Sequence, residues 1–509
     1  MKAVQAFIGG AILCAGTSAN AEWRRYETQH FVIYSEAGDA KATDRATRLE
    51  KIDGLMRMAT GLSSEVQPVK VRIYELADNG QVEAALGGNA EGVAGFYSSN
   101  VLGPFAVTLR RIIDGEDMSP EVVLHHEYAH HFMLQYFPAD YPGWYSEGFA
   151  ELIGASKILD DGKVAYGYPA KYRGAFIGAD WVPVSQIIAT PTEKLPPYDV
   201  YGQGWAMTHF FTFTKGRSQQ LRQYLAALEA GKSPADAAKA FGELSNLDRD
   251  THLYVLKGSF DYKPVDVKIQ QPVIQRVTPV GAAEAALIPE TIAFKDYDVR
   301  LIKKVSERAE ALKHRAALLE RIRAKAARYP NDPYALYLLA EAENLSGTST
   351  GAQAAVDRLL SIDPNNIHGL IRKSLLLSDA AAKLSGQARL DRAAEARAVA
   401  MKANKGDPDE PLTYVAYYQS YHSAGLPTPQ DALGALEGAL DKLPDNTQVR
   451  RMLVEEYASQ KRWADAITTL EPIANESHDS PLRAEARERM AQLEAQLKVE
   501  RAAKQTAAN

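Results

Sequence analysis

Residues 122–133 read Val-Val-Leu-His-His-Glu-Tyr-Ala-His-His-Phe-Met, and this stretch sets the character of the first half of the chain. Ser119 and Pro120, just before it, offer an N-cap followed by proline at the first helical position. They predict a helix that begins there. Apolar residues fill much of its remaining surface, as expected for a helix buried in a domain core.

Within this predicted helix, His126 and His130 lie four residues apart, which is about 40° around the helix axis. Both imidazoles can therefore reach a single ion. Glu127 lies about 60° beyond His130, close enough to contact a water molecule on that ion without binding the ion itself. His125 and His131 point about 100° and 140° away from His126, so we expect them to pack elsewhere. The alternative is a pair of core histidines that happen to flank a glutamate.

A third candidate ligand follows the turn at residues 137–143. Glu147 and Glu151 are four residues apart on a second predicted helix, so they share one face. His126, His130 and Glu147 supply the three protein ligands that a catalytic zinc needs beside one open position. Two imidazoles and one carboxylate suit zinc best among divalent ions, which predicts one Zn²⁺ per chain. Glu151 can accept a hydrogen bond from the far nitrogen of a ligating histidine; the alternative is a solvated helix charge.

These two motifs resemble those of a known family. His-His-Glu-Tyr-Ala-His-His at 125–131, followed by Trp-Tyr-Ser-Glu-Gly-Phe-Ala-Glu at 144–151, is similar to the gluzincin metallopeptidases of the aminopeptidase N-like and thermolysin-like group. In that group the glutamate ligand stands in a motif often written Asn-Glu-Gly-Phe-Ala, which residues 146–150 match at four of five positions. The resemblance covers about residues 22–258 and implies a zinc peptidase with Glu127 as the general base.

A further segment, Val-Tyr-Gly-Gln-Gly-Trp-Ala at 200–206, looks like the aminopeptidase segment whose tyrosine stabilises the tetrahedral intermediate. This makes Tyr201 the candidate for that role; the alternative is an ordinary core or surface tyrosine. Two departures from the family stand out. The gap between His130 and Glu147 is slightly shorter than in aminopeptidases, so the connecting loop must differ. Residues 92–100, where aminopeptidases hold the substrate amino group with a glutamate, contain no acidic residue. An endopeptidase is therefore favoured over an aminopeptidase.

The predicted mechanism follows from these parts. Glu127 takes a proton from a water molecule activated by zinc and later passes it to the leaving amine. We expect the strand at 105–110 to bind substrate as an added strand, because it precedes the motif helix. One alternative is a catalytically inactive metallopeptidase-like scaffold whose repeats mediate protein–protein interaction. Another is a zinc hydrolase that acts on bonds other than peptide bonds.

The remainder of the first region mixes strand and helix patterns. Residues 31–34 and 69–74 are short β-branched runs typical of strands, and residues 40–59 carry apolar residues at helical intervals. We therefore expect an α+β domain with a small mixed sheet beside the motif helices. The resemblance implies that this domain is thermolysin-like.

The second region, residues 300–500, is rich in Ala, Leu, Glu and Arg and is predicted to be helical throughout. Similar proline-containing turns recur in it, at 329–332, 363–366, 407–410 and 443–446. Pro330 and Pro364 are 34 residues apart, the period of a tetratricopeptide repeat (TPR), and the next steps of 44 and 36 fit one insertion and a small irregularity. This predicts an all-α TPR-like solenoid that recruits a protein substrate or partner. The alternative is a generic antiparallel helical bundle.

The first 21 residues differ from both regions. Lys2, an apolar run at 3–15 and the small residues at 19–21 predict a cleaved signal peptide, and hence a periplasmic or secreted protein of a Gram-negative bacterium. Cys14 is the only cysteine, so the mature protein would contain no disulfide. Lipid attachment at Cys14 is the alternative.

Composition and boundaries complete the prediction. The net charge of −6 without a clustered basic stripe argues against nucleic-acid binding, and no later apolar run is long enough to span a membrane. The proline-punctuated segment 259–299 is expected to connect a metallopeptidase-like domain at 22–258 to the repeats at 300–500, and residues 501–509 are expected to form a disordered tail.

Overall fold

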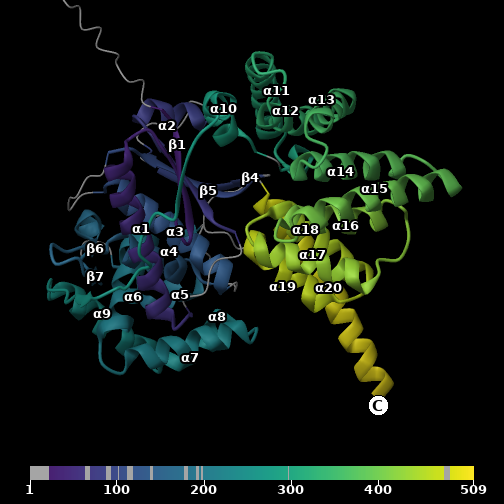
Figure 1. Ribbon diagram of the computed structural model, residues 1–509. Coiled ribbons are helices and arrows are strands. Elements are labelled where there is room, and N and C mark those ends of the chain that lie inside the picture. The colour runs from purple at the N-terminus through teal and green to yellow at the C-terminus, as the bar shows by residue number, and fades with distance from the viewer. Residues whose placement is uncertain are drawn as a thin grey trace, which may run out of the picture.

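The computed structural model describes residues 22–63, 69–86, 93, 95–100, 102–111, 118–137, 141–176, 181–190, 194–195, 199–295, 297–474 and 482–508. In Figure 1 a mixed body of strands and helices forms the N-terminal half, and a curved array of paired helices forms the C-terminal half. Residues 1–21, the predicted signal peptide, lie outside the described residues, as do parts of segments 92–100 and 137–143.

The N-terminal body is built on a six-stranded mixed sheet in the order β4-β5-β3-β2-β1-β9. Its strands are β1 (Arg24–Glu27), β2 (Phe31–Ser35), β3 (Val71–Leu76), β4 (Gly95–Asn100), β5 (Gly103–Leu109) and β9 (Arg276–Pro279). The pairs β2–β3 and β3–β5 are parallel and the others are antiparallel. The predicted small mixed sheet is confirmed. However, β5 is paired with β4 on one side and β3 on the other, so it has no free edge to which an extended substrate could add. The expectation that the strand at 105–110 binds substrate in this way is therefore wrong. The edge strand next to β5 is β4, and β9 forms the other edge of the sheet.

The two faces of the sheet have different cores because side chains alternate along each strand. Ile33, Ile73 and Ala106 face helices α1 (Asp39–Thr60) and α3 (Pro120–Tyr136). Tyr34, Tyr74 and Val107 face the other way, toward α2 (Asn79–Ala85) and α10 (Ala282–Ala293). The predicted helix at 40–59 is thus α1, and its packing leaves the motif helix α3 on the same sheet face.

Further elements complete the body beside α3. The helices are α4 (Gly143–Gly154), a 3-10 helix (Lys171–Phe176), α5 (Val184–Ala189), a π-helix (Asp199–Gln203), α6 (Gly204–Phe213), α7 (Arg217–Glu229), α8 (Pro234–Ala237), a 3-10 helix (Ala238–Phe241) and α9 (Leu244–Leu256). A small second sheet contains β6 (Lys157–Ile158), β7 (Val164–Tyr166) and β8 (Lys263–Val265). The segment 259–299, expected as a connector, contributes β8, β9 and α10, and a 3-10 helix (Val299–Leu301) begins at its end.

The C-terminal half is a series of helical pairs. Its helices are α11 (Val305–Ala326), α12 (Pro333–Leu345), α13 (Ser349–Ile362), α14 (Ile367–Ala382), α15 (Gly386–Gly406), α16 (Pro411–His422), α17 (Gln430–Lys442), α18 (Thr447–Ser459), α19 (Trp463–Ala474) and α20 (Arg483–Ala508). The four predicted turns fall between helices. The last residue of each turn caps the next helix with its side chain: Asp332, Asn366, Glu410 and Asn446.

Two features of this half concern the spacing of its turns and the end of the chain. The step of 44 residues contains the long helix α15, which accounts for the expected insertion. Helix α20 continues to Ala508, through residues expected to form a disordered tail, because Ala, Lys, Gln and Arg there are strong helix formers. Among the described residues, no helix combines the length and apolar character needed to cross a membrane.

Candidate metal centre

Helices α3 and α4 carry the candidate ligands and pack against each other. The Oγ atom of Ser119 accepts a hydrogen bond from the Val122 amide at 3.3 Å, and Pro120 is the first helical residue, so the predicted helix start is confirmed. Leu124 and Tyr128 of α3 share one core with Ala150 of α4. This shared core holds the two helices with their polar faces toward each other.

At this contact, three side-chain atoms converge. The Nε2 atoms of His126 and His130 are 3.2 Å apart, and each lies 3.3 Å from Oε2 of Glu147. All three residues are buried or half-buried, and the His130 side chain keeps 17% of its surface exposed. The site is therefore reachable from solvent on the His130 side.

This donor set fits a zinc ion. Ligands at the usual zinc distances of about 2.0–2.1 Å in a tetrahedron are separated from one another by about 3.3 Å. The three edges found here match that separation. The donors are two imidazole nitrogens and one carboxylate oxygen, a set that zinc favours. The His126, His130 and Glu147 side chains can thus hold the ion and leave a fourth position open.

The outer contacts orient both imidazoles. Nδ1 of His126 lies 3.2 Å from Oε1 of Glu151, and Nδ1 of His130 lies 3.4 Å from Oγ of Ser146. These contacts direct the Nε2 lone pairs toward the shared position. Glu151 is held in turn by Arg173, whose Nη2 and Nε atoms donate to its two oxygens at 2.6 and 3.1 Å.

The charges of this cluster are strongly coupled. Burial alone would lower the pKa of His126, but the carboxylates of Glu147 and Glu151 raise it to about 10. Burial opposes ionisation of Glu147, yet His130 and His126 hold the pKa of that carboxyl well below its usual range. A proton on His126 therefore balances the carboxylates, and a bound cation can replace it.

Glu127 and Tyr201 lie beside the three candidate ligands. Glu127 is half-buried on α3, and the Tyr201 ring centroid is 5.9 Å from that of His126. Burial, with the Glu147 and Glu127 carboxylates nearby, raises the pKa of Tyr201 and keeps its hydroxyl protonated. The Arg173 guanidinium lies over the Tyr201 ring at 4.8 Å from its centroid. Arg173 thus contacts both Glu151 and Tyr201.

The approach of Tyr201 depends on two glycines. A Cβ atom at Gly148 of α4 would lie 2.3 Å from the backbone oxygen of Gly204, and one at Gly204 would lie 2.5 Å from that of Trp144. Only glycine permits this separation of α4 and the start of α6. The Gly148–Gly204 contact therefore lets the π-helix that carries Tyr201 reach the centre.

A second group of potential metal ligands, His30, Glu50 and Asp53, lies behind α3. Its oxygen atoms already have protein donors. Nδ1 of His30 lies 2.7 Å from Oε2 of Glu50, while the Asp53 oxygens accept from Arg57 at 2.6 Å and from Tyr128 at 2.7 Å. Since Tyr128 belongs to α3, this group fixes the motif helix against α1.

A buried arginine fixes the other end of α3. Arg45 of α1 donates to Glu75 of β3 at 2.8 Å, to the carbonyl oxygen of Leu109 at 2.9 Å, and to Glu121 in the first turn of α3. These bonds compensate a fully buried guanidinium. They tie α1, the sheet and α3 into one unit.

The flanking histidines point away from the candidate ligands, as expected. His125 is buried, and burial lowers its pKa to about 3. His131 lies 2.7 Å through Nδ1 from the Tyr97 hydroxyl of β4, which in turn donates to Asp445 at 2.6 Å. Asp445 lies in the turn before α18, so this series of hydrogen bonds links the motif helix to the repeats.

Sequence reasoning missed Arg173, Ser146, Tyr97 and Asp445. None of them stands in a periodic pattern with the ligands, because their contacts join separate elements. Asp445 belongs to a turn that the repeat pattern identifies, but its partner Tyr97 lies 348 residues away.

Comparisons with known proteins bear on the repeats. The family described as Tetratricopeptide repeat matches residues 428–498. Among solved structures, TTC0263, a thermophilic TPR protein of Thermus thermophilus, is similar to this chain at 21% identity with a TM-score of 0.32, covering 39% of this chain and 98% of that one. No curated protein matches. The family match confirms the TPR prediction at the C-terminal end of the array.

Proposed function

We propose that the N-terminal body is a zinc-dependent, gluzincin-type peptidase with a thermolysin-like arrangement, and that it acts as an endopeptidase. The observation that carries this proposal is the triangle of His126 Nε2, His130 Nε2 and Glu147 Oε2, with edges of 3.2–3.3 Å. A zinc ion there supplies Lewis-acid polarisation of a carbonyl group and a lowered pKa for water.

The protein residues divide the remaining work. Glu127 accepts a proton from the attacking water at its carboxylate and delivers it to the leaving amine. The Tyr201 hydroxyl, kept protonated by burial, donates a hydrogen bond to the oxygen that becomes negative. Arg173 positions Tyr201 and Glu151 together. Strand β4, one of the two edge strands of the sheet, offers its backbone to an extended substrate.

The repeats recruit a protein substrate or partner in this proposal, since stacked repeats form extended concave binding surfaces. They also brace the body: Gln135 of α3 donates to the carbonyl oxygen of Asp441 at 3.0 Å, beside the Tyr97–Asp445 bond. Deletion of residues after 300 separates the two roles. Loss of activity on a protein substrate alone indicates recruitment, and loss on a small peptide as well indicates bracing.

The decisive experiment is metal analysis of the purified protein, wild type beside Glu147→Ala and Glu50→Gln. We expect about one zinc per chain in the wild type and in Glu50→Gln, and little or none in Glu147→Ala. Loss of zinc in Glu50→Gln, with zinc retained in Glu147→Ala, would show that the metal binds at the group formed by His30, Glu50 and Asp53 instead. Circular dichroism checks that each variant is folded.

The second candidate function is an inactive scaffold whose repeats bind protein partners. The family match to the repeats alone favours it. Absence of zinc from every variant, even after zinc is supplied, would support this scaffold. Zinc binding with hydrolysis of esters but not peptides would instead indicate a different zinc hydrolase.

Export is part of the proposal. The apolar run at 3–15 supports removal of residues 1–21 and a periplasmic or secreted location. N-terminal sequencing of the protein from an extracytoplasmic fraction tests this: the first residue should be Glu22.

A further inference from the structure

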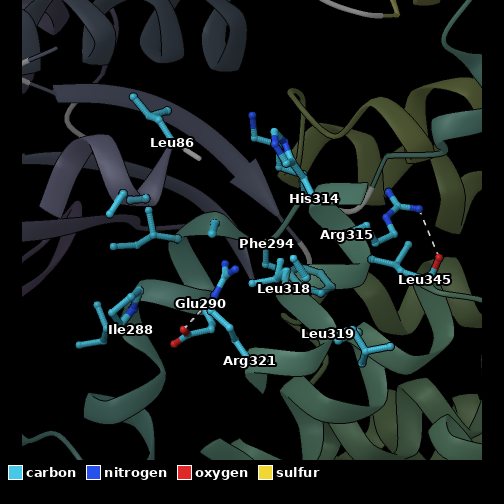
Figure 2. A pocket seen from close by; sticks show the side chains of 18 of the residues that line it. Leu86, Ile288, Glu290, Phe294, His314, Arg315, Leu318, Leu319, Arg321 and Leu345 are labelled. Atoms are coloured by element: carbon cyan, nitrogen blue, oxygen red, sulfur yellow. Dashed lines mark hydrogen bonds and ion pairs between the residues drawn. The ribbon is translucent and has the colours of Figure 1, made fainter. Parts of the chain in front are cut away.

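A cavity of about 830 Å³ lies where the first repeat helices meet the N-terminal body (Figure 2). Its walls come from α2, α10, α11 and α12. Leu76 and Ile288 line it and belong to the core on the sheet face opposite α3. The cavity is therefore separate from the candidate metal centre.

Small side chains keep this space open. Ala84, Ala285, Ala311 and Ala342 line it from four different helices. Larger apolar groups, among them Leu318 and Phe294 in Figure 2, cover the interior between them. The volume falls within the roughly 300–1,000 Å³ of small-molecule pockets, which are mostly apolar with a few polar groups.

The charged groups of the lining are unevenly balanced. The two carboxylates are already engaged by cations: Glu36 accepts from Arg110 at 2.5 Å, and Glu290 pairs with Lys325 at 2.6 Å and more loosely with Arg321 at 3.6 Å. Arg110 and Lys325 stand outside the lining.

The cations of the lining are thus in excess. Lys295 pairs with no carboxylate among the described residues, and Arg321 shares Glu290 with Lys325. Arg315 is fixed at the cavity by a bond to the carbonyl oxygen of Tyr297 at 2.7 Å and by one to that of Leu345 at 3.2 Å, the latter drawn in Figure 2. An apolar interior beside excess positive charge is complementary to an anion that carries an apolar chain.

We propose that this cavity binds a small amphipathic anion with one alkyl chain, such as a fatty acid or an alkyl phosphate. The alkyl chain of the ligand lies among Leu318, Phe294 and Ile288, and its anionic head group lies near Lys295 and Arg321. This inference does not depend on the proposed peptidase activity.

Titration calorimetry of the full-length protein tests the ligand class, with laurate below its micelle concentration as the probe. We expect one saturable site, with dodecanol bound about tenfold more weakly because it lacks the charge, and no binding of butyrate because it lacks the chain. Dodecyl phosphate distinguishes a phosphate head group from a carboxylate. Absence of saturable laurate binding, or equal affinity for dodecanol, would overturn the proposal.

Variants test the location. Ala311→Trp should abolish laurate binding by filling the cavity, and Lys295→Gln should weaken it about fivefold to tenfold. Lys313→Gln removes an exposed charge from α11 outside the lining and should change nothing. Glu147→Ala should also bind laurate normally, which separates this site from the metal centre. If Ala311→Trp is folded and still binds laurate, or if Lys313→Gln and Lys295→Gln weaken binding equally, the site lies elsewhere.

Discussion

Helices α3 and α14 are of similar length but bury different chemistry. Helix α3 buries Glu121, His125, His126 and His131 beside its apolar residues. Helix α14 buries mainly aliphatic and small residues, such as Leu370 and Ile371. Burial of an ionisable group is unfavourable unless it is compensated. The buried ionisable groups that need compensation are therefore concentrated in α3, while α14 stacks its repeat on the next.

The two regions also differ in how far apart in the fold the partners of their buried ionisable groups lie. Residues of α3 find partners on α1, β4 and α4, and Gln135 bonds the carbonyl oxygen of Asp441 in α17. In the repeats, buried pairs such as Arg372–Glu341 join successive repeats. Stability of a repeat array is approximately a sum of such neighbour terms. A change in α3 should thus affect the whole body, whereas a change in a repeat should remain local.

The largest expected effect tests whether the polar interior of α3 is catalytic. Glu127→Gln should lower kcat about 10²- to 10⁴-fold on a peptide substrate, because it removes the proposed general base. Zinc content should stay unchanged, since Glu127 is not one of the three convergent ligands. Full activity with zinc bound would disprove the assigned role of Glu127.

The next test compares one substitution in the two regions. Arg45→Met leaves Glu75 and Glu121 buried without their guanidinium and should lower the free energy of unfolding of the body by about 3–5 kcal/mol. Arg323→Met in α11 breaks a pair that is 40% exposed on the arginine side and should have a much smaller effect. Chemical denaturation followed by tryptophan fluorescence measures both; equal effects would contradict the contrast.

Acid should separate the regions as well. Burial lowers the pKa of His125 to about 3 and of His131 and His209 to about 4. At these three histidines the unfolded chain binds protons near pH 6.5 while the folded body does not, so the stability that they contribute above pH 6.5 is lost as the pH falls toward 4. Each pKa unit is worth about 1.4 kcal/mol per histidine.

Melting curves between pH 7.5 and 4.5 check this acid effect. Trp23, Trp144, Trp181 and Trp205 lie in the body and Trp463 in the repeats, so fluorescence reports mainly on the body. Circular dichroism follows the helical array. Simultaneous loss of both signals at every pH would indicate that the regions unfold together.

The smallest effect concerns the contact between the regions. Asp445→Asn weakens the bond from Tyr97 and should destabilise the interface by about 1 kcal/mol, seen as faster limited proteolysis between the halves. Asp409→Asn changes the same position of the preceding turn, where the side chain is 89% exposed, and is the matched control. Identical proteolysis of both variants would show that the Tyr97 bond does not hold the halves together.

Sequence alone predicted the parts whose geometry is local. The spacing of His126 and His130 becomes an angle once a helix forms, and the cap at Ser119 marks where it starts. The recurring turns likewise predicted the repeat helices. The strand at 105–110 was expected to bind substrate, but it lies inside the sheet, because strand order depends on contacts between distant segments. Arg173 was not predicted for the same reason: no helical or strand spacing in the sequence relates it to its partners Glu151 and Tyr201.

The pairing of β1 with β9 has a consequence for biosynthesis. Arg24 of the first strand pairs with Pro279, so β1 lacks its outer neighbour until most of the body has left the ribosome. An unpaired strand edge can join other chains, and charged side chains discourage this. The sequence of β1, Arg-Arg-Tyr-Glu, is mostly charged. The charged side chains of β1 thus discourage pairing with other chains until β9 has been synthesised. A truncated gene product that ends before residue 276 would leave this edge of β1 unpaired.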